Sequence, residues 1–148
     1  MPRIDDEVKT NFANERHRFV TNLIYTAGWV QNIFTEYLKP YGISPQQFNI
    51  LRILRGADDW VAMNNVKDLM IEKSPNATRL ADKLLTKKLI ERKRSREDRR
   101  VVYIRISPPG HELLIEIDQN DSEIMVALER ITVREANQLS KILDKFRG

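Results

Sequence analysis

The sequence predicts a mainly helical α+β fold in which two strands form one antiparallel ribbon. Apolar residues recur at spacings of three and four over most of the 148 residues, which is the period of packed helices. Between residues 89 and 106 the period changes to two, which is the period of strands. With 41% hydrophobic residues the chain can build a packed core, so we predict a single domain over residues 1–148.

A long first helix is predicted over residues 6–38. Its apolar stripe includes Phe19, Leu23 and Ile33 and continues to Leu38. Proline and glycine within residues 40–42 end it.

A second helix is predicted from Ser44 to about Arg55. Ser44, Pro45 and Gln47 match a capping box, in which the serine accepts a backbone N–H bond and the glutamine side chain reaches back. A turn at residues 56–59 follows, and residues 60–62 can form a very short strand.

Two short helices come next. Asn64 or Asn65 can cap the first of them. Ser74, followed by Pro75, predicts the N-cap and first turn of the second, which Leu80 and two further leucines hold against the core.

The strand pair covers residues 89–94 and 101–106. Ile90, Arg92 and Arg94 fall on one side of the first strand, opposite Glu91 and Lys93. The connecting residues 95–100 are too polar to bury and carry three arginines, so they form an exposed turn.

Two C-terminal helices complete the chain. Ser107 and Pro108 begin one that should run to about residue 130, and Thr132 with Glu135 forms a capping box for the last. The terminal helices are longer and more apolar than the middle of the chain requires, so they are expected to pack against a second copy. The prediction is a homodimer in which residues 1–40 and 108–148 dimerise and residues 41–107 form a separate lobe.

Positive charge is concentrated in the strand pair. Residues 87–105 hold nine basic and three acidic residues, a net charge of +6, whereas the whole chain carries only +4. A local basic element on a nearly neutral body favours a polyanionic partner, although a solvated charged loop would give the same pattern.

Several function classes find no support. The chain has no cysteine, and its two histidines, His17 and His111, have no partner at metal-ligand spacing, so no metal and no cofactor are expected. No phosphate loop and no nucleophile or zincin motif is present, so an enzyme is not expected. No run of 18 apolar residues and no signal-peptide pattern occurs, which predicts a cytoplasmic protein with no membrane contact.

Two short helices followed at once by a basic hairpin are typical of a winged helix-turn-helix, in which the second short helix enters the DNA major groove and the hairpin is the wing. The chain also resembles the MarR family of transcriptional regulators. The resemblance rests on an ordered series of motifs: Asp82-Lys83-Leu84, Leu89-Ile90-Glu91-Arg92, Asp98-Arg99-Arg100 and Ile106-Ser107-Pro108-Pro109-Gly110. Lys88 departs from the family pattern, which has glycine at this position. The resemblance therefore implies that Lys88 must accept a left-handed or distorted helix end.

The N-terminal turn of the predicted recognition helix should meet DNA. Its candidate residues are Ser74, Asn76, Ala77, Thr78 and Arg79, of which Asn76 and Arg79 can make bidentate bonds to a base edge. The alternative is that Ser74 is only a cap and Arg79 only a surface charge.

The wing supplies the second group of candidates. The resemblance implies that Arg99 and Arg100 enter or follow the minor groove, with Asp98 orienting an arginine. Arg94 and Arg96, together with Lys87, Arg92 and Lys93, are interpreted either as phosphate contacts or as solubility charges.

The resemblance further implies a repressor that binds a pseudo-palindromic operator in double-stranded DNA and is relieved by a small aromatic or amphipathic effector. The effector would lie between the dimer helices and the lobe, where five aromatic side chains are candidates: Tyr25, Trp29, Tyr37, Phe48 and Trp60. Aromatics at helical spacing also occur simply as core residues. A winged-helix module that binds a protein or an RNA partner is the alternative function.

Overall fold

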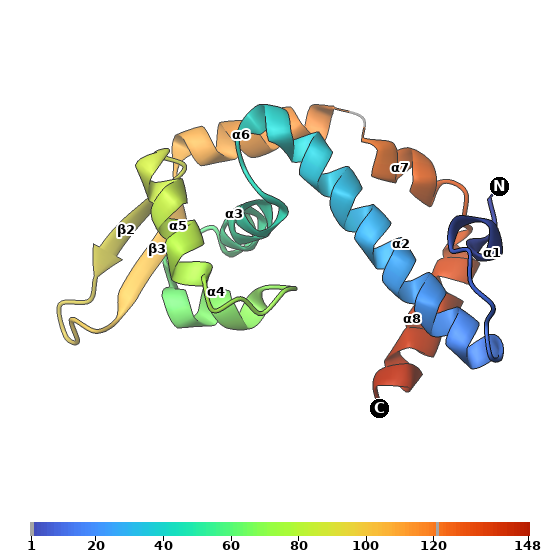
Figure 1. Ribbon diagram of the computed structural model, residues 1–148. Helices are drawn as coiled ribbons and strands as arrows, with labels where there is room; N and C mark the ends of the chain where they lie inside the picture. The colour runs from blue at the N-terminus through green and yellow to red at the C-terminus, as the bar shows by residue number, and fades with distance from the viewer. Residues whose placement is uncertain (1, 121) are drawn as a thin grey trace.

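The computed structural model describes residues 2–120 and 122–148. Its elements follow in the order α1 (Ile4–Glu7), α2 (Glu15–Leu38), the 3-10 helix η1 (Lys39–Tyr41), α3 (Pro45–Ala57), β1 (Val61–Ala62), α4 (Met63–Leu69), α5 (Ala77–Thr86), β2 (Ile90–Arg94), β3 (Val102–Ile106), α6 (Pro108–Gln119), α7 (Glu123–Leu128) and α8 (Val133–Arg147). In Figure 1 a lobe of α3, α4, α5 and the sheet lies at one end, and α2 runs from it toward α1, α7 and α8.

The hydrophobic core lies in the lobe. Its buried residues run from Leu38 to Ile117 and come from α2, the lobe elements and α6. Within this set Leu51, Leu54 and Leu84 are fully buried. No buried residue lies on α7 or α8 in the part of the chain that the structure describes. The terminal helices therefore contribute an apolar surface that this single chain leaves uncovered.

A three-stranded antiparallel sheet forms the side of the lobe, in the order β1-β3-β2. In its register Ile90 lies opposite Ile106, and Arg92 lies opposite Ile104. The isoleucines of this face are buried against the helices. The predicted strand at residues 60–62 is present as β1, paired with β3.

The first helix begins later than the prediction. Residues 4–7 form the separate short α1, and α2 starts at Glu15 because the Asn14 side chain accepts the His17 N–H at 3.0 Å. Asparagine competes for backbone donors in this way and therefore caps helices more readily than it continues them.

The predicted helix from 108 to about 130 is two helices in the structure. Helix α6 ends at Gln119, and Asn120 is extended, with φ −92° and ψ 130°. The Tyr37 hydroxyl of α2 shares its proton between the Asn120 carbonyl at 2.8 Å and the Ile117 carbonyl at 2.5 Å. This bond to a distant helix replaces the next helical turn, which a local sequence pattern does not reveal.

The two short helices also begin elsewhere than predicted. Helix α4 starts at Met63, so Asn64 and Asn65 lie in its first turn instead of capping it. Helix α5 starts at Ala77 because Ser74 and the next two residues form a turn: the Ser74 hydroxyl accepts from the Asn76 N–H at 3.1 Å, and its carbonyl accepts from the Ala77 N–H at 3.3 Å. The serine thus caps a turn ahead of the helix.

Lys88, which replaces the glycine of the family pattern, has the left-handed backbone predicted for it. Its φ of 61° is left-handed, and the following Leu89 N–H returns to the Leu84 carbonyl at 3.0 Å, which closes the end of α5. Ser107 caps α6 as predicted and donates its hydroxyl to the Lys88 carbonyl at 2.6 Å. Gly110 lies so close to this connection that a Cβ there would be 2.2 Å from the Leu89 carbonyl oxygen.

Candidate nucleic-acid interface

Helix α5 is held in the lobe by one face and exposes the other. Ala77, Ala81 and Leu84, at spacings of four and three, are buried. Thr78 and Arg79 therefore point outward from the first turn and are exposed. Arg79 makes no hydrogen bond or ion pair with another described residue, so its guanidinium is available to a partner.

The candidates of the first turn do not share one environment. Asn76 is exposed, as are Thr78 and Arg79, whereas Ser74 is half-buried with its hydroxyl engaged in the turn. The expectation for Ala77 is wrong: its side chain is fully buried in the core and cannot touch DNA. Ala77 is four residues before Ala81 and seven before Leu84, so it lies on the same inward face of α5.

Residues of α3 fix the connection that leads into α5. Asn49 accepts the Ile71 N–H at 3.0 Å, and Gln46 donates to the Glu72 carboxylate at 3.1 Å. Gln47, which is buried, completes the capping box of α3 and also donates to the Leu80 carbonyl at 3.5 Å. The capping box was predictable from its local pattern, but these links depend on how α3 packs against α5.

The wing tip is organised by Ser95 and Asp98. The Ser95 hydroxyl accepts the N–H groups of Glu97 and Asp98, both at 3.2 Å. The Asp98 carboxylate accepts from the Arg100 backbone at 3.0 Å and from its guanidinium at 3.1 and 3.3 Å. These bonds from Arg100 hold the pKa of Asp98 below its usual value. Asp98 is thus occupied in orienting Arg100.

The basic residues of the wing divide into two groups. Arg94, Arg96 and Arg99 are exposed and have no ion pair or hydrogen bond to the residues that the structure describes. Two other cations are engaged: the Lys87 ammonium bonds the Gly42 carbonyl, and Arg92 pairs with Asp82 of α5 at 2.7 Å.

The outer face of the sheet carries a further basic group. Lys93 and Arg105 both lie over the Trp60 ring, at 4.3 and 4.5 Å from its centroid, and Arg105 also bonds Glu91 at 2.5 Å. Such cation–π contacts fix the directions of the cations. Of the wing cations, Arg94, Arg96 and Arg99 are therefore the least constrained by the protein itself.

The structure does not gather the five aromatic effector candidates into one site. Phe48 is buried in the core, and Trp60 lies on the sheet beneath Lys93 and Arg105, so neither belongs with the others. Tyr37 donates its hydroxyl to the Ile117 carbonyl at 2.5 Å. Only Tyr25 and Trp29 are more than one-third exposed. The apolar spacing that suggested the set does not distinguish a core ring from an exposed one.

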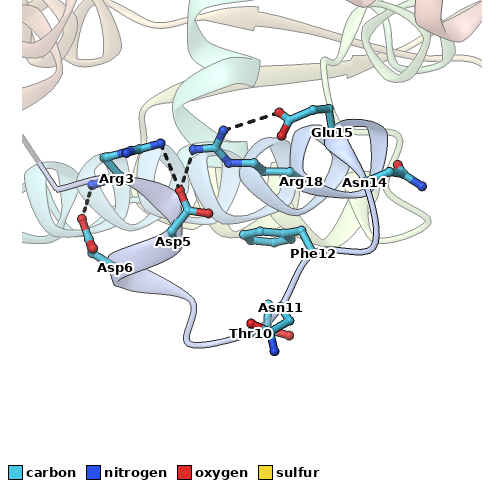
Figure 2. Close-up of a pocket in the computed structure, with 9 residues that line it drawn as sticks. All are labelled: Arg3, Asp5, Asp6, Thr10, Asn11, Phe12, Asn14, Glu15 and Arg18. Atoms are coloured by element: carbon cyan, nitrogen blue, oxygen red, sulfur yellow. Dashed lines mark hydrogen bonds and ion pairs between the residues drawn. The ribbon is translucent and has the colours of Figure 1, made fainter.

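An open hollow of about 750 Å³ lies elsewhere, between the N-terminal residues and the start of α2. Figure 2 shows Arg18 at its wall, between Asp5 at 2.6 Å and Glu15 at 3.5 Å. The bond to Asp5 raises the pKa of Arg18 further. None of the five aromatic candidates lines this hollow. Its charged groups are two guanidiniums and three carboxylates, and it is not part of the lobe that carries α5 and the wing.

The lobe therefore presents an exposed helix turn and a basic hairpin from one sheet-and-helix unit. Its geometry suits a groove edged by phosphates, since the helix offers hydrogen-bond donors and the hairpin offers free guanidinium groups. Within the described residues, no helix has the length and apolar character that a membrane crossing requires.

Comparison with known proteins agrees with this geometry. Residues 32–117 match the family described as "Transcriptional regulator SarA/Rot". The HTH-type transcriptional regulator MhqR of Bacillus subtilis is 26% identical over 117 residues, which cover 78% of this chain and 80% of MhqR. The transcriptional repressor MprA of Escherichia coli is 29% identical over 113 residues, 75% of this chain, and the match spans 64% of MprA.

Solved structures share the fold. A mutant of MarR from Escherichia coli complexed with operator DNA superposes with a TM-score of 0.74, at 23% identity, over 93% of this chain and 99% of that one. A MarR transcription factor from Planctomyces limnophilus gives a TM-score of 0.66 at 26% identity, over 90% and 98% of the two chains. The winged helix-turn-helix fold and the resemblance to MarR regulators predicted from the sequence are confirmed.

Proposed function

The chain belongs to the SarA/Rot family of transcriptional regulators, and from this premise we propose that it is a repressor that binds operator DNA sequence-specifically as a homodimer. One observation carries the proposal: a single lobe exposes the first turn of α5 together with three unpaired wing arginines, Arg94, Arg96 and Arg99. The proposed partner is double-stranded DNA, which offers base edges and phosphates side by side.

In the proposed complex α5 lies in the major groove. Arg79 and Asn76 contact base edges, and Ser74 and Thr78 contact the backbone or neighbouring bases. Arg99 and Arg100 lie along the minor groove, with Arg100 aimed by Asp98, while Arg94 and Arg96 contact phosphates. The bonds that hold Arg100 to Asp98 favour this assignment, because a preset guanidinium loses less freedom on binding.

The proposed dimer forms through the terminal helices. Helix α8 exposes Leu139, Ile142 and Phe146 by about half, and Met125 and Val126 of α7 are exposed to a similar degree. An apolar surface of this kind usually marks an interface. Residues 108–119 also pack into the lobe core through Leu114 and Ile117, so they connect the dimer to the lobe.

A two-fold dimer presents two lobes to a pseudo-palindromic operator, with half-sites about one helical turn apart. The proposal makes the protein a cytoplasmic binding protein, not an enzyme. Relief by a small aromatic or amphipathic effector is part of the proposal, with Tyr25 and Trp29 of α2 as its contacts, since both are partly exposed. The Tyr25 hydroxyl donates to Glu7 at 2.7 Å, which raises the pKa of Tyr25 and ties this site to the N-terminal residues.

The test is selection of duplexes from a randomised library by the purified protein, followed by titration of the selected duplex and a scrambled one at two salt concentrations. We expect a palindromic motif, affinity that falls steeply with salt, and a scattering mass of about twice the 17.4 kDa chain. Equal affinity for both duplexes would contradict sequence-specific binding. Tighter binding to single-stranded RNA would favour the RNA-binding alternative.

A further inference from the structure

Two exposed apolar side chains of the lobe have no role in the proposed dimer. Among residues 2–120 and 122–148, fourteen large apolar side chains are exposed, and twelve of them lie on α2, α6, α7, α8 or the link between α7 and α8. The other two are Leu69 and Ile71, at the end of α4 and in the connection to α5. Ile71 is 90% exposed, the largest value in this set.

The connection holds Ile71 in a fixed position. Met70 immediately before it is 3% exposed and packs in the core. The Ile71 N–H donates to Asn49 at 3.0 Å, and the next side chain, Glu72, accepts from Gln46 at 3.1 Å. Because its own backbone and both neighbouring residues are anchored, the Ile71 side chain is held in solvent. Its apolar surface stays hydrated, which is unfavourable.

The surroundings of Ile71 are those of the proposed DNA-binding surface. It lies three residues before Ser74, and except for Pro75 the exposed side chains that follow it are polar: Glu72, Lys73, Asn76, Thr78 and Arg79. Figure 1 shows the connection between α4 and α5 as a loop that extends beyond the end of α4 and then returns to the first turn of α5. In the major groove only the C5-methyl group of thymine offers an apolar contact among the base edges.

We propose that Ile71 reads a thymine methyl group in each half-site, a specificity contact that rests on the proposed function. The pinned backbone provides the position, and the isoleucine side chain provides the apolar surface. A cytosine or an adenine at that place presents an amino group instead, which an isoleucine cannot bond.

The test removes the methyl group and nothing else. In the duplex selected by the unaltered protein, each thymine of a half-site is replaced in turn by deoxyuridine, and affinity is measured for the unaltered protein, Ile71→Ala, Ile71→Val and the matched control Leu69→Ala. We expect one thymine position to be sensitive: its replacement in one half-site should weaken binding by the unaltered protein about fourfold, the value of one buried methyl-sized group, and its replacement in both half-sites about sixteenfold. Ile71→Ala, which alters both subunits, should bind the all-thymine duplex about as weakly as the unaltered protein binds the doubly replaced duplex, and it should be indifferent to the replacement. Leu69→Ala and Ile71→Val should stay sensitive.

Each other outcome contradicts the proposal. Equal deoxyuridine sensitivity in the unaltered protein and Ile71→Ala would show that another residue meets the methyl group, as would loss of sensitivity in Leu69→Ala. If Ile71 packs against the second copy, Ile71→Ala will dissociate the dimer on dilution while the pattern of deoxyuridine effects is unchanged. Failure of the unaltered protein to prefer its selected duplex refutes the proposed function itself, whereas a specific motif without any methyl dependence refutes this inference alone.

Discussion

Arg92 of β2 donates from Nη1 to the Asp82 carboxylate of α5 at 2.7 Å, so an ion pair joins the helix and the wing that we assign to the two DNA grooves. About half of each side chain is exposed, at 45% and 54%. An exposed pair contributes only about 0–1 kcal/mol to folding. Its main effect is on geometry, since it fixes the spacing between α5 and the root of the wing.

Breaking this pair should change DNA recognition more than stability. For Asp82→Asn we expect the free energy of unfolding to fall by less than about 1 kcal/mol. The released Arg92 adds positive charge near the phosphates, so affinity for random DNA should rise while the preference for the operator falls. Urea unfolding and binding to both duplexes measure the two effects. The exchanged pair, Asp82→Arg with Arg92→Asp, is the control and should recover most of the preference for the operator. If the effects of the two single substitutions on that preference simply add in the double variant, the assigned role of the pair is contradicted.

Lys88 stores a backbone strain that glycine would relieve. Its φ of 61° is left-handed, where a Cβ is disfavoured. Lys88→Gly should therefore raise the free energy of unfolding by up to about 1 kcal/mol. Lys88→Ala removes the same side-chain charge but keeps the Cβ, so it should give no such gain. Denaturant unfolding compares the two variants. If Lys88→Gly and Lys88→Ala are equally stable, the relief of strain is offset by the greater chain entropy that glycine loses on folding.

Gly110 permits the close approach of α6 to the end of α5. A Cβ at position 110 would lie 2.2 Å from the Leu89 carbonyl oxygen and 2.8 Å from Ile106 Cγ1. Because backbone and core atoms cannot move aside, Gly110→Ala should destabilise the fold by about 3 kcal/mol or more. Gly56→Ala is the matched control: it lies within α3 with nothing near its Cβ and should stabilise by about 0.5–1 kcal/mol. Thermal melting of the two variants should move in opposite directions.

Features set by neighbouring residues were predictable from the sequence. The capping boxes at Ser44 and Thr132 involve residues three apart, and both are present. The strand pair follows from alternation, and the left-handed Lys88 follows from its place in the resemblance to the MarR family. Each of these depends on a short stretch of chain, so a local pattern is sufficient evidence.

Features set by distant contacts were not predictable. The break after Gln119 depends on the bond between Asn120 and Tyr37, which are 83 residues apart. Ala77 lies in the core because the face of α5 that also carries Ala81 and Leu84 packs inward, and the serine–proline pattern at residues 74–75 does not show which face this is. The same limit applies to the Asp82–Arg92 pair, since neither residue shows its partner in the sequence.

The wing should account for part of the salt dependence of binding. Arg99→Ala with Arg100→Ala removes two guanidinium groups at the tip, of which Arg100 is 92% exposed. Binding to all duplexes should weaken, and the slope of log affinity against log salt should flatten by about one to two per subunit. Removing Arg16 and Arg134, two exposed arginines outside the lobe, is the control for net charge. An unchanged slope in the wing variant would place its arginines away from the DNA.

Arg79 should determine base preference more than overall affinity. It lies two residues from the buried Ala77 and two from the buried Ala81, which places it about 160–200° around α5 from both. It has no partner among the described residues, so both guanidinium edges are free for a guanine. Arg79→Ala should cost roughly 1–3 kcal/mol on the selected operator and much less on random DNA.

The matched variant Arg79→Lys separates base reading from charge. Lysine keeps the positive charge but is a point donor without the planar fork of arginine, so it should retain binding to random DNA and still lose preference at the same base pair. In a two-fold dimer the loss must occur at symmetric positions in both half-sites. Selection from a randomised library with each variant measures it. If Arg79→Lys and Arg79→Ala both recover the original motif with equal information at every position, Arg79 contacts only phosphate, and base reading must come from Ile71, Asn76 or Thr78.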